Sequence, residues 1–97
     1  MELEFSAELW VWDGPAAWHF VTVPPDDAAA IRAIREPVVR GFGSVRAIAT
    51  IGKMTWATSV FPQSSDGTYV LPVKKQVRIA EAISEGDGVQ VRIEVVG

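Results

Sequence analysis

Apolar and polar residues alternate between Leu3 and Trp12. A repeat of two predicts a strand with one buried face. Asp13-Gly14-Pro15 follows with residue types that favour a turn. Residues 18–23 predict a second strand because they are mostly aromatic and β-branched, and the prolines at 24 and 25 end it.

The next segment, Asp26 to Arg35, predicts a short helix. Prolines precede it, acids occupy its first turn and an arginine its last, which complements the helix dipole. Ile31 and Ile34 would form one apolar stripe along it.

The remainder of the chain predicts three strands, a helix and a last strand. Gly52-Lys53 lies between the first two as a two-residue turn with glycine first, the type II′ pattern. Gly86-Asp87-Gly88 ends the helix. The expected elements are strands over 43–51, 54–61 and 68–71, a helix over 73–83 and a strand over 89–96.

The two halves share one order of elements, β-β-α-β, with Pro24 and Pro72 at the same place in each. One such unit cannot cover its own apolar face, whereas two can close around a core. We therefore expect a mostly β protein, a six-stranded closed or split β-barrel built from two β-β-α-β repeats, with two short capping helices. The alternative is that the strand–proline–helix pattern occurs twice by chance. The expected core residues are Phe5, Leu9, Val21, Val23, Val45, Ile51, Val60, Leu71, Val89, Val91 and Ile93.

Composition narrows the class of protein. The 97 residues fit one domain, residues 1–97, and 48% of them are hydrophobic, as in globular proteins. The absence of cysteine excludes disulfides and thiolate sites. The start of the chain is acidic and no apolar run is long enough to cross a membrane, so a cytoplasmic protein is expected. A net charge of −3 argues against nucleic-acid binding but leaves room for a local basic patch.

No set of residues predicts catalysis. His19 is the single histidine, and the carboxylates are too scattered to complete a zinc site around it. Ser59 has no evident base partner, and Asp26-Asp27 fits the start of a helix. We expect no enzyme and no catalytic, metal-binding or cofactor-binding residue.

The four tryptophans are the most unusual feature of the composition. Trp56 and Trp18 are expected to fill the barrel, Trp18 together with Phe20. Trp10 and Trp12 lie in phase with charged residues and would form an aromatic rim at a ligand or partner site. The alternative is that they pack beneath a loop or helix.

Lys74, Lys75 and Arg78 form a basic patch at the start of the second helix. Cations there oppose the helix dipole, which suggests an anionic partner or a neighbouring carboxylate. A solvated helix face is the alternative.

The second half also carries a family resemblance, through Thr58-Ser59-Val60-Phe61-Pro62, Gly67-Thr68-Tyr69-Val70-Leu71-Pro72-Val73-Lys74-Lys75 and Gly86-Asp87. These stretches resemble a bacterial and archaeal family known only as a domain of unknown function, the one numbered nineteen hundred and five. The resemblance implies a compact six-stranded barrel with helical caps and no established activity. Leu71-Pro72, Val77-Arg78 and Gly86-Asp87 are also similar to the pattern of swapped-hairpin, double-split-barrel regulators.

These observations favour a non-catalytic binding or accessory module for a small ligand or a protein. The alternative is a nucleic-acid-binding regulator that uses the basic patch. Because both halves of the barrel would lie in one chain, we expect a monomer.

Overall fold

The computed structural model describes residues 1–14, 17–35, 43–63 and 68–96. It contains the predicted elements, with shifts of a few residues at their ends. The strands and helices follow one another as β1 (Glu2–Glu8), β2 (Trp10–Trp12), β3 (Trp18–Val23), α1 (Pro25–Arg35), β4 (Val45–Ile51), β5 (Met54–Pro62), β6 (Tyr69–Pro72), α2 (Lys75–Ala80) and β7 (Gly88–Val95). Pro15, part of the first predicted turn, lies outside the described residues.

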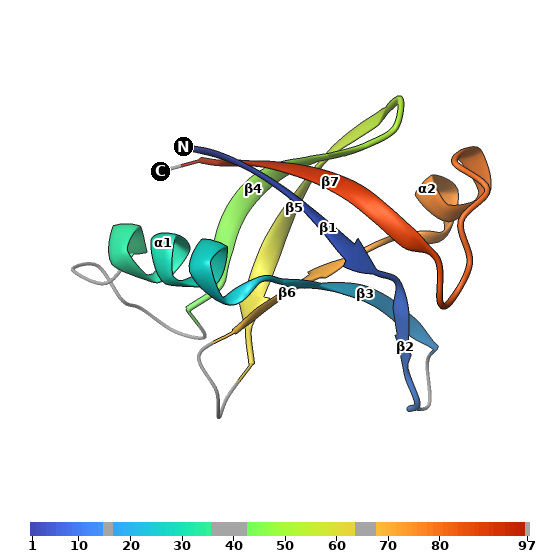
Figure 1. The fold of residues 1–97 in the computed structure, drawn as a ribbon, viewed down its shortest axis with the longest axis horizontal. Helices are drawn as coiled ribbons and strands as arrows, with labels where there is room; N and C mark the ends of the chain where they lie inside the picture. The colour runs from blue at the N-terminus through green and yellow to red at the C-terminus, as the bar shows by residue number, and fades with distance from the viewer. Residues whose placement is uncertain (15–16, 36–42, 64–67, 97) are drawn as a thin grey trace.

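All the strands belong to one antiparallel sheet in the order β1-β7-β4-β5-β6-β3-β2. The sheet curves into a half-barrel, and α1 and α2 lie at opposite ends of the long axis of the molecule (Figure 1). A mostly β fold with two short helices is therefore confirmed. Closure of the barrel, the duplication and the likeness to swapped-hairpin regulators stay predictions.

The described residues form seven strands and not the expected six, because the first predicted strand is divided into β1 and β2. β1 pairs with β7 and β2 pairs with β3, so the chain changes neighbours at the residue between them, Leu9. Leu9 is fully buried. Its N–H donates to the carbonyl of Asp87 at 3.0 Å, and its carbonyl accepts from the N–H of Gly86 at 2.8 Å. Both backbone groups of Leu9 therefore have hydrogen-bond partners, although the residue lies between the two strands.

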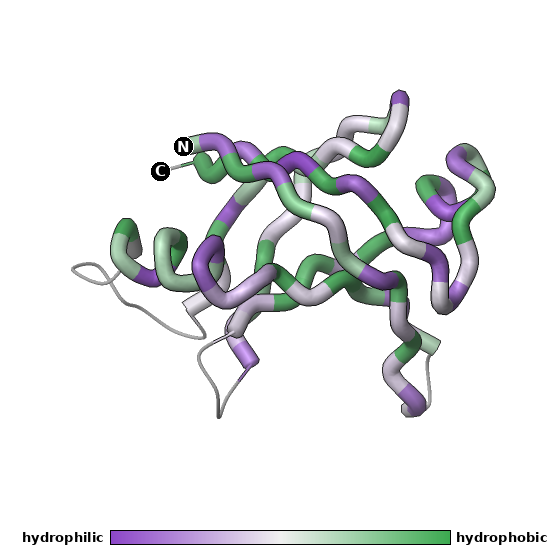
Figure 2. The backbone as a smooth tube through the Cα atoms, in the orientation of Figure 1, coloured by the Kyte–Doolittle hydropathy of each residue, from purple (hydrophilic) through white to green (hydrophobic). Residues whose placement is uncertain are grey.

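The core contains every one of the predicted core residues. Hydrophilic and hydrophobic residues alternate along β1 and β7 (Figure 2), which is how these strands present one apolar face to the interior. The helices contribute Ala28 and Ile31 from α1 and Val77 from α2. The predicted stripe on α1 is wrong at Ile34, whose side chain is exposed.

Helix α2 is shorter than predicted because the chain turns out of it after Ala80. Ala82 adopts a left-handed conformation, with φ 53°. Its N–H donates to the carbonyl of Ile79 at 3.2 Å, and the N–H of Ile83 donates to the carbonyl of Arg78 at 3.0 Å. This pair of hydrogen bonds defines a Schellman motif, which satisfies the last carbonyls of a helix.

The turn between β4 and β5 matches its prediction. Ile51 pairs with Met54 across two residues, and Gly52 has φ 59°. Lys53 is not among the described residues with positive φ, as the type II′ turn requires. The N–H of Lys53 donates to a carboxylate oxygen of Glu81 at 3.2 Å, which ties this hairpin to the end of α2.

Among the described residues, no helix combines the length and the apolar character needed to cross a membrane.

Candidate functional site

The convex, outer side of the sheet carries a row of large apolar side chains at one end. Cross-strand pairs place Trp10 opposite Phe20, Trp12 opposite Trp18, and Phe20 opposite Pro72. These residues alternate with Val21 and Val23, which point into the core, so they share the opposite face. Phe61 joins them from β5 through its pairing with Val70. We call this surface the aromatic face: Trp10, Trp12, Trp18, Phe20, Phe61, Val70 and Pro72.

Ring contacts hold the aromatic face together. The ring centroids of Trp10 and Phe20 lie 5.1 Å apart, and those of Trp18 and Phe20 lie 6.3 Å apart with nearly parallel planes. The indole N–H of Trp10 donates to the hydroxyl of Thr22 at 2.9 Å. Trp10 is therefore anchored, and the other tryptophans of this surface project further into solvent.

The exposure of these side chains corrects one prediction and agrees with another. Trp18 is 52% exposed and Phe20 lies on the same outer face, so they do not fill the barrel. Trp56, in contrast, is buried in the core as expected. Trp12 is 48% exposed and Phe61 42%. Trp12, Trp18, Phe20 and Phe61 line a shallow hollow of about 300 Å³.

Two further hollows lie beside Trp18, with volumes of about 580 and 230 Å³. They have Trp18, Ala57, Thr58 and Pro72 in common, and we call them together the Trp18 groove. Its charged side chains are cations. Arg46 lines the larger hollow and Lys74 the smaller one, and among the described residues no aspartate or glutamate lines either.

The predicted basic patch is divided by the fold. Lys74 and Lys75 are exposed, and only Lys74 lines the groove. Arg78 is half-buried and turns inward, where its Nε donates to the carbonyl of Val73 at 3.3 Å. Its Nη1 lies 3.3 Å from Nε2 of His19. Arg78 therefore ties α2 to the strands beneath it.

The contact with Arg78 also indicates which ring nitrogen of His19 accepts a hydrogen bond. A guanidinium can only donate, so Nε2 of His19 accepts the hydrogen bond from Arg78. The ring proton then lies on Nδ1, which is 3.1 Å from the carbonyl of Ala17 and donates to it. His19 thus joins α2 to the start of β3.

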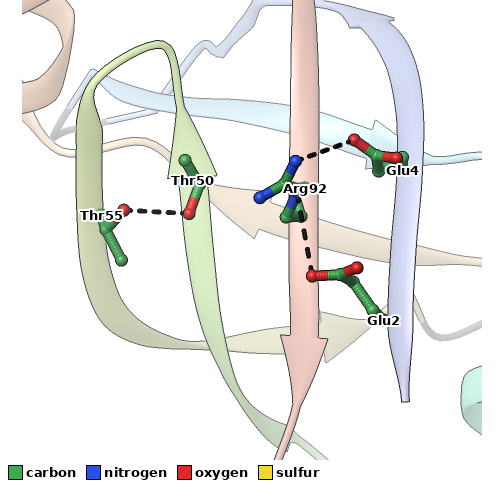
Figure 3. Close-up of polar contacts among 5 residues, drawn as sticks. All are labelled: Glu2, Glu4, Thr50, Thr55 and Arg92. Atoms are coloured by element: carbon green, nitrogen blue, oxygen red, sulfur yellow. Dashed lines mark hydrogen bonds and ion pairs between the residues drawn. The ribbon is translucent and has the colours of Figure 1, made fainter.

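The other end of the outer face is polar. Arg92 of β7 lies between Glu2 and Glu4 of β1, at 3.8 and 3.4 Å. The hydroxyls of Thr50 and Thr55 lie 3.0 Å apart on the neighbouring hairpin (Figure 3). One sheet therefore presents a polar, acidic half beside β1 and an aromatic half beside β2 and β3.

Of the predicted site residues, Trp10 and Trp12 lie on the aromatic face and Lys74 lines the Trp18 groove. Lys75 is exposed on α2 and does not line the groove, and Arg78 is engaged inward. Sequence reasoning missed Trp18, Phe61 and Arg46 as lining residues, because their proximity depends on strand pairing. Among the described residues, no group of three histidines, aspartates or glutamates is placed to hold a metal ion.

Comparison with known proteins gives the family. Residues 5–93 match the family described as a domain of unknown function, DUF1905. The chain belongs to this family. The match confirms the resemblance seen in the sequence, and its description assigns no activity. No curated protein matches the chain.

Proposed function

We propose that this member of DUF1905 is a non-catalytic binding module, and that its ligand binds at the aromatic face and the Trp18 groove. The observation that carries the proposal is the exposed cross-strand pair of Trp12 and Trp18. Contiguous apolar surface in contact with water is unfavourable, and such patches commonly mark binding sites. Tryptophan also supplies a large, rigid contact area.

The lining of the groove indicates the chemistry of the ligand. Trp18 and Pro72 offer flat apolar surfaces, and Thr58 offers a hydroxyl. Arg46 and Lys74 supply positive charge in a protein whose net charge is −3. These groups favour a ligand with an apolar body and at least one negative charge.

A thermal-shift screen of metabolite and peptide collections tests this function, with hits measured again by tryptophan fluorescence. We expect the Trp18→Ala variant to bind each hit at least about tenfold more weakly, the equivalent of about 1.4 kcal/mol. Ile79→Ala is the control, since Ile79 is an exposed apolar residue on α2. Hits that bind both variants as tightly as the wild type would contradict the proposed site.

The second candidate function is nucleic-acid binding, favoured by the position of Lys74 beside Trp18. Bases would stack on tryptophan while lysines contact phosphates. Fluorescence anisotropy with labelled single-stranded and duplex DNA measures this at low salt. Binding that weakens steeply with salt and is lost in Lys74→Gln would support it. No change in anisotropy at tens of micromolar protein would dispose of it.

We also propose that the chain is a cytoplasmic monomer whose barrel closes from two duplicated halves. The pairing pattern supports duplication, because β5 pairs first with β4 and then with β6. The first strand of the other half behaves alike, as β1 pairs with β7 and β2 with β3. Light scattering coupled to size exclusion measures the oligomeric state, and a dimer at every concentration would contradict a monomer.

A further inference from the structure

Among the described residues, no strand lies along the edge of β5 that faces the Trp18 groove. β5 pairs with β4 from Met54 to Val60, but with β6 only at Phe61 and Pro62. In the part of the chain that the structure describes, no other strand pairs with β5. Ala57, Thr58 and Ser59 all line the groove, as consecutive residues do where a strand edge is open.

The hairpin geometry shows which backbone groups point into this groove. The residues that flank a two-residue turn, Ile51 and Met54, form a hydrogen-bonded pair, and such pairs alternate along an antiparallel ladder. Ala57 and Ser59 therefore occupy the intervening pairs, and their N–H and C=O groups point away from β4.

Two neighbouring hydrogen bonds support this assignment of backbone directions along β5. Arg46 is opposite Ser59 in the β4–β5 ladder. The carbonyl of Arg46 accepts a hydrogen bond from the N–H of Val96 at 3.0 Å, so it points away from β5. Just after the last residue of β5, the N–H of Gln63 donates to the carbonyl of Thr68 at 2.8 Å, in the direction of β6. Odd-numbered residues of β5 thus direct their backbone groups toward the groove.

Open edges usually carry charged side chains that prevent another strand from pairing there. The outer side chains of β1 follow this rule, with Glu2, Glu4 and Glu8. At the open edge of β5 the outer side chains are those of Thr55, Ala57 and Ser59, and none is charged. This edge therefore has no such protection.

Together these observations point to the kind of partner that the groove binds. This inference rests on the function proposed above. We propose that the Trp18 groove binds an extended, acidic and apolar peptide segment of another protein, which adds as a strand to the edge of β5. Its backbone pairs with the N–H and C=O groups of Ala57 and with the N–H of Ser59, whose carbonyl also accepts from the hydroxyl of Thr58 at 3.5 Å. Its apolar side chains pack on Trp18 and Phe61, and its carboxylates lie near Arg46 and Lys74.

A strand edge is complementary to a peptide in a way that it is not to the phosphate backbone of a nucleic acid. It presents donors and acceptors in alternation, as the added backbone does. Phosphates accept hydrogen bonds but cannot donate to the carbonyls of Ala57 and Ser59. A second copy of this chain fits less well, because pairing two β5 edges would bring Arg46 and Lys74 of both copies together.

The test uses the full chain and three capped peptides labelled with fluorescein: Glu-Thr-Val-Thr-Glu, whose acidic and apolar side chains share one face of a strand, Lys-Thr-Val-Thr-Lys, and the glutamate peptide with N-methyl groups on alternate amides. We expect the first to bind at least about tenfold more tightly than each of the other two. Binding should also slow hydrogen exchange at the amides of Ala57 and Ser59. Because N-methylation alters only the peptide, this comparison does not depend on the folding of a variant.

A protein variant provides an independent check. Ala57→Pro removes the N–H that points into the groove, and that N–H takes no part in the ladder with β4. We expect Ala57→Pro to weaken binding of the glutamate peptide at least about tenfold. Ala57→Val, which keeps the N–H, should bind as the wild type does.

The outcomes separate this inference from the function on which it rests. Equal binding of the methylated and unmethylated peptides, or of the lysine and glutamate peptides, would overturn strand addition. If indole-3-acetate or single-stranded DNA binds in a manner that requires Trp18 while no peptide binds, the binding module stands and the peptide partner is wrong. Protection of Ala57 and Ser59 that grows with protein concentration alone would replace the peptide with a second copy. If none of these probes binds, both proposals fail.

Discussion

The end of helix α2 allows a stabilising substitution to be derived from the backbone alone. Ala82 is the one non-glycine residue with positive φ among the described residues. A left-handed conformation costs an L-residue other than glycine about 1–2 kcal/mol. Glycine avoids this cost, but it also gains freedom in the unfolded chain, worth about 0.4–1 kcal/mol. The difference, about 0 to 1.6 kcal/mol, predicts that Ala82→Gly stabilises the protein by about 0.8 kcal/mol, the middle of that range.

Thermal and urea unfolding followed by circular dichroism measure this effect. For a domain of this size, 1 kcal/mol corresponds to a change in Tm of about 4–8 °C. The urea midpoint should rise while the slope of the transition stays the same. Ala29→Gly is the matched control, because Ala29 is exposed within α1 and the same change there should cost about 0.5–1 kcal/mol.

Opposite signs for one chemical change are the diagnostic result. They would show that the backbone conformation, and not the loss of a methyl group, decides the effect. If Ala82→Gly lowers Tm as much as Ala29→Gly does, the left-handed cap is not populated in solution and the reasoning is refuted.

Four other substitutions probe the turn, the polar half of the outer face and the tryptophans. Gly52→Ala should cost about 1–3 kcal/mol in urea unfolding, because its φ is 59° and an added Cβ would overlap the Glu81 carboxylate. A neutral result would contradict the turn geometry. Arg92→Ala should cost less than about 1 kcal/mol, since its ion pairs are exposed; a larger loss would mean that they are shielded from solvent. Trp56→Ala should cost about 3–5 kcal/mol and Trp18→Ala less than about 1, and equal losses would contradict their different burial.

The alternation of apolar residues was sufficient to predict the core, because it is a local property of each strand. Phe5 and Val91 are buried wherever their strands pair, provided that one face of each strand turns inward. The break at Leu9 has no such signal, since Leu9 continues the alternation of β1 and is itself buried. Only the change of neighbouring strand divides this segment, and that depends on β7 and β3.

The candidate site was harder to predict because it depends on phase and on distant pairing. Trp18 is a residue type that is often buried. In β3, however, the buried positions are Val21 and Val23, whose side chains point to the opposite face of the strand from that of Trp18. Arg78 was expected to belong to a free basic patch. It contacts His19, 59 residues earlier in the chain, and no local pattern signals that contact.

The two ends of the outer face differ in what they contribute to folding, and this difference favours a binding role for the aromatic end. The core is already filled by Trp56 and the strand residues, so the exposed surfaces of Trp12 and Trp18 add little to its burial. Trp10 has its own anchor in Thr22. Exposed indoles therefore bring a risk of non-specific association without a matching gain in stability. A ligand that covers them, and that also pairs with the open edge of β5, would in one interaction cover the exposed apolar area and satisfy the backbone N–H groups of Ala57 and Ser59. A strand-forming peptide is the class of ligand that does both.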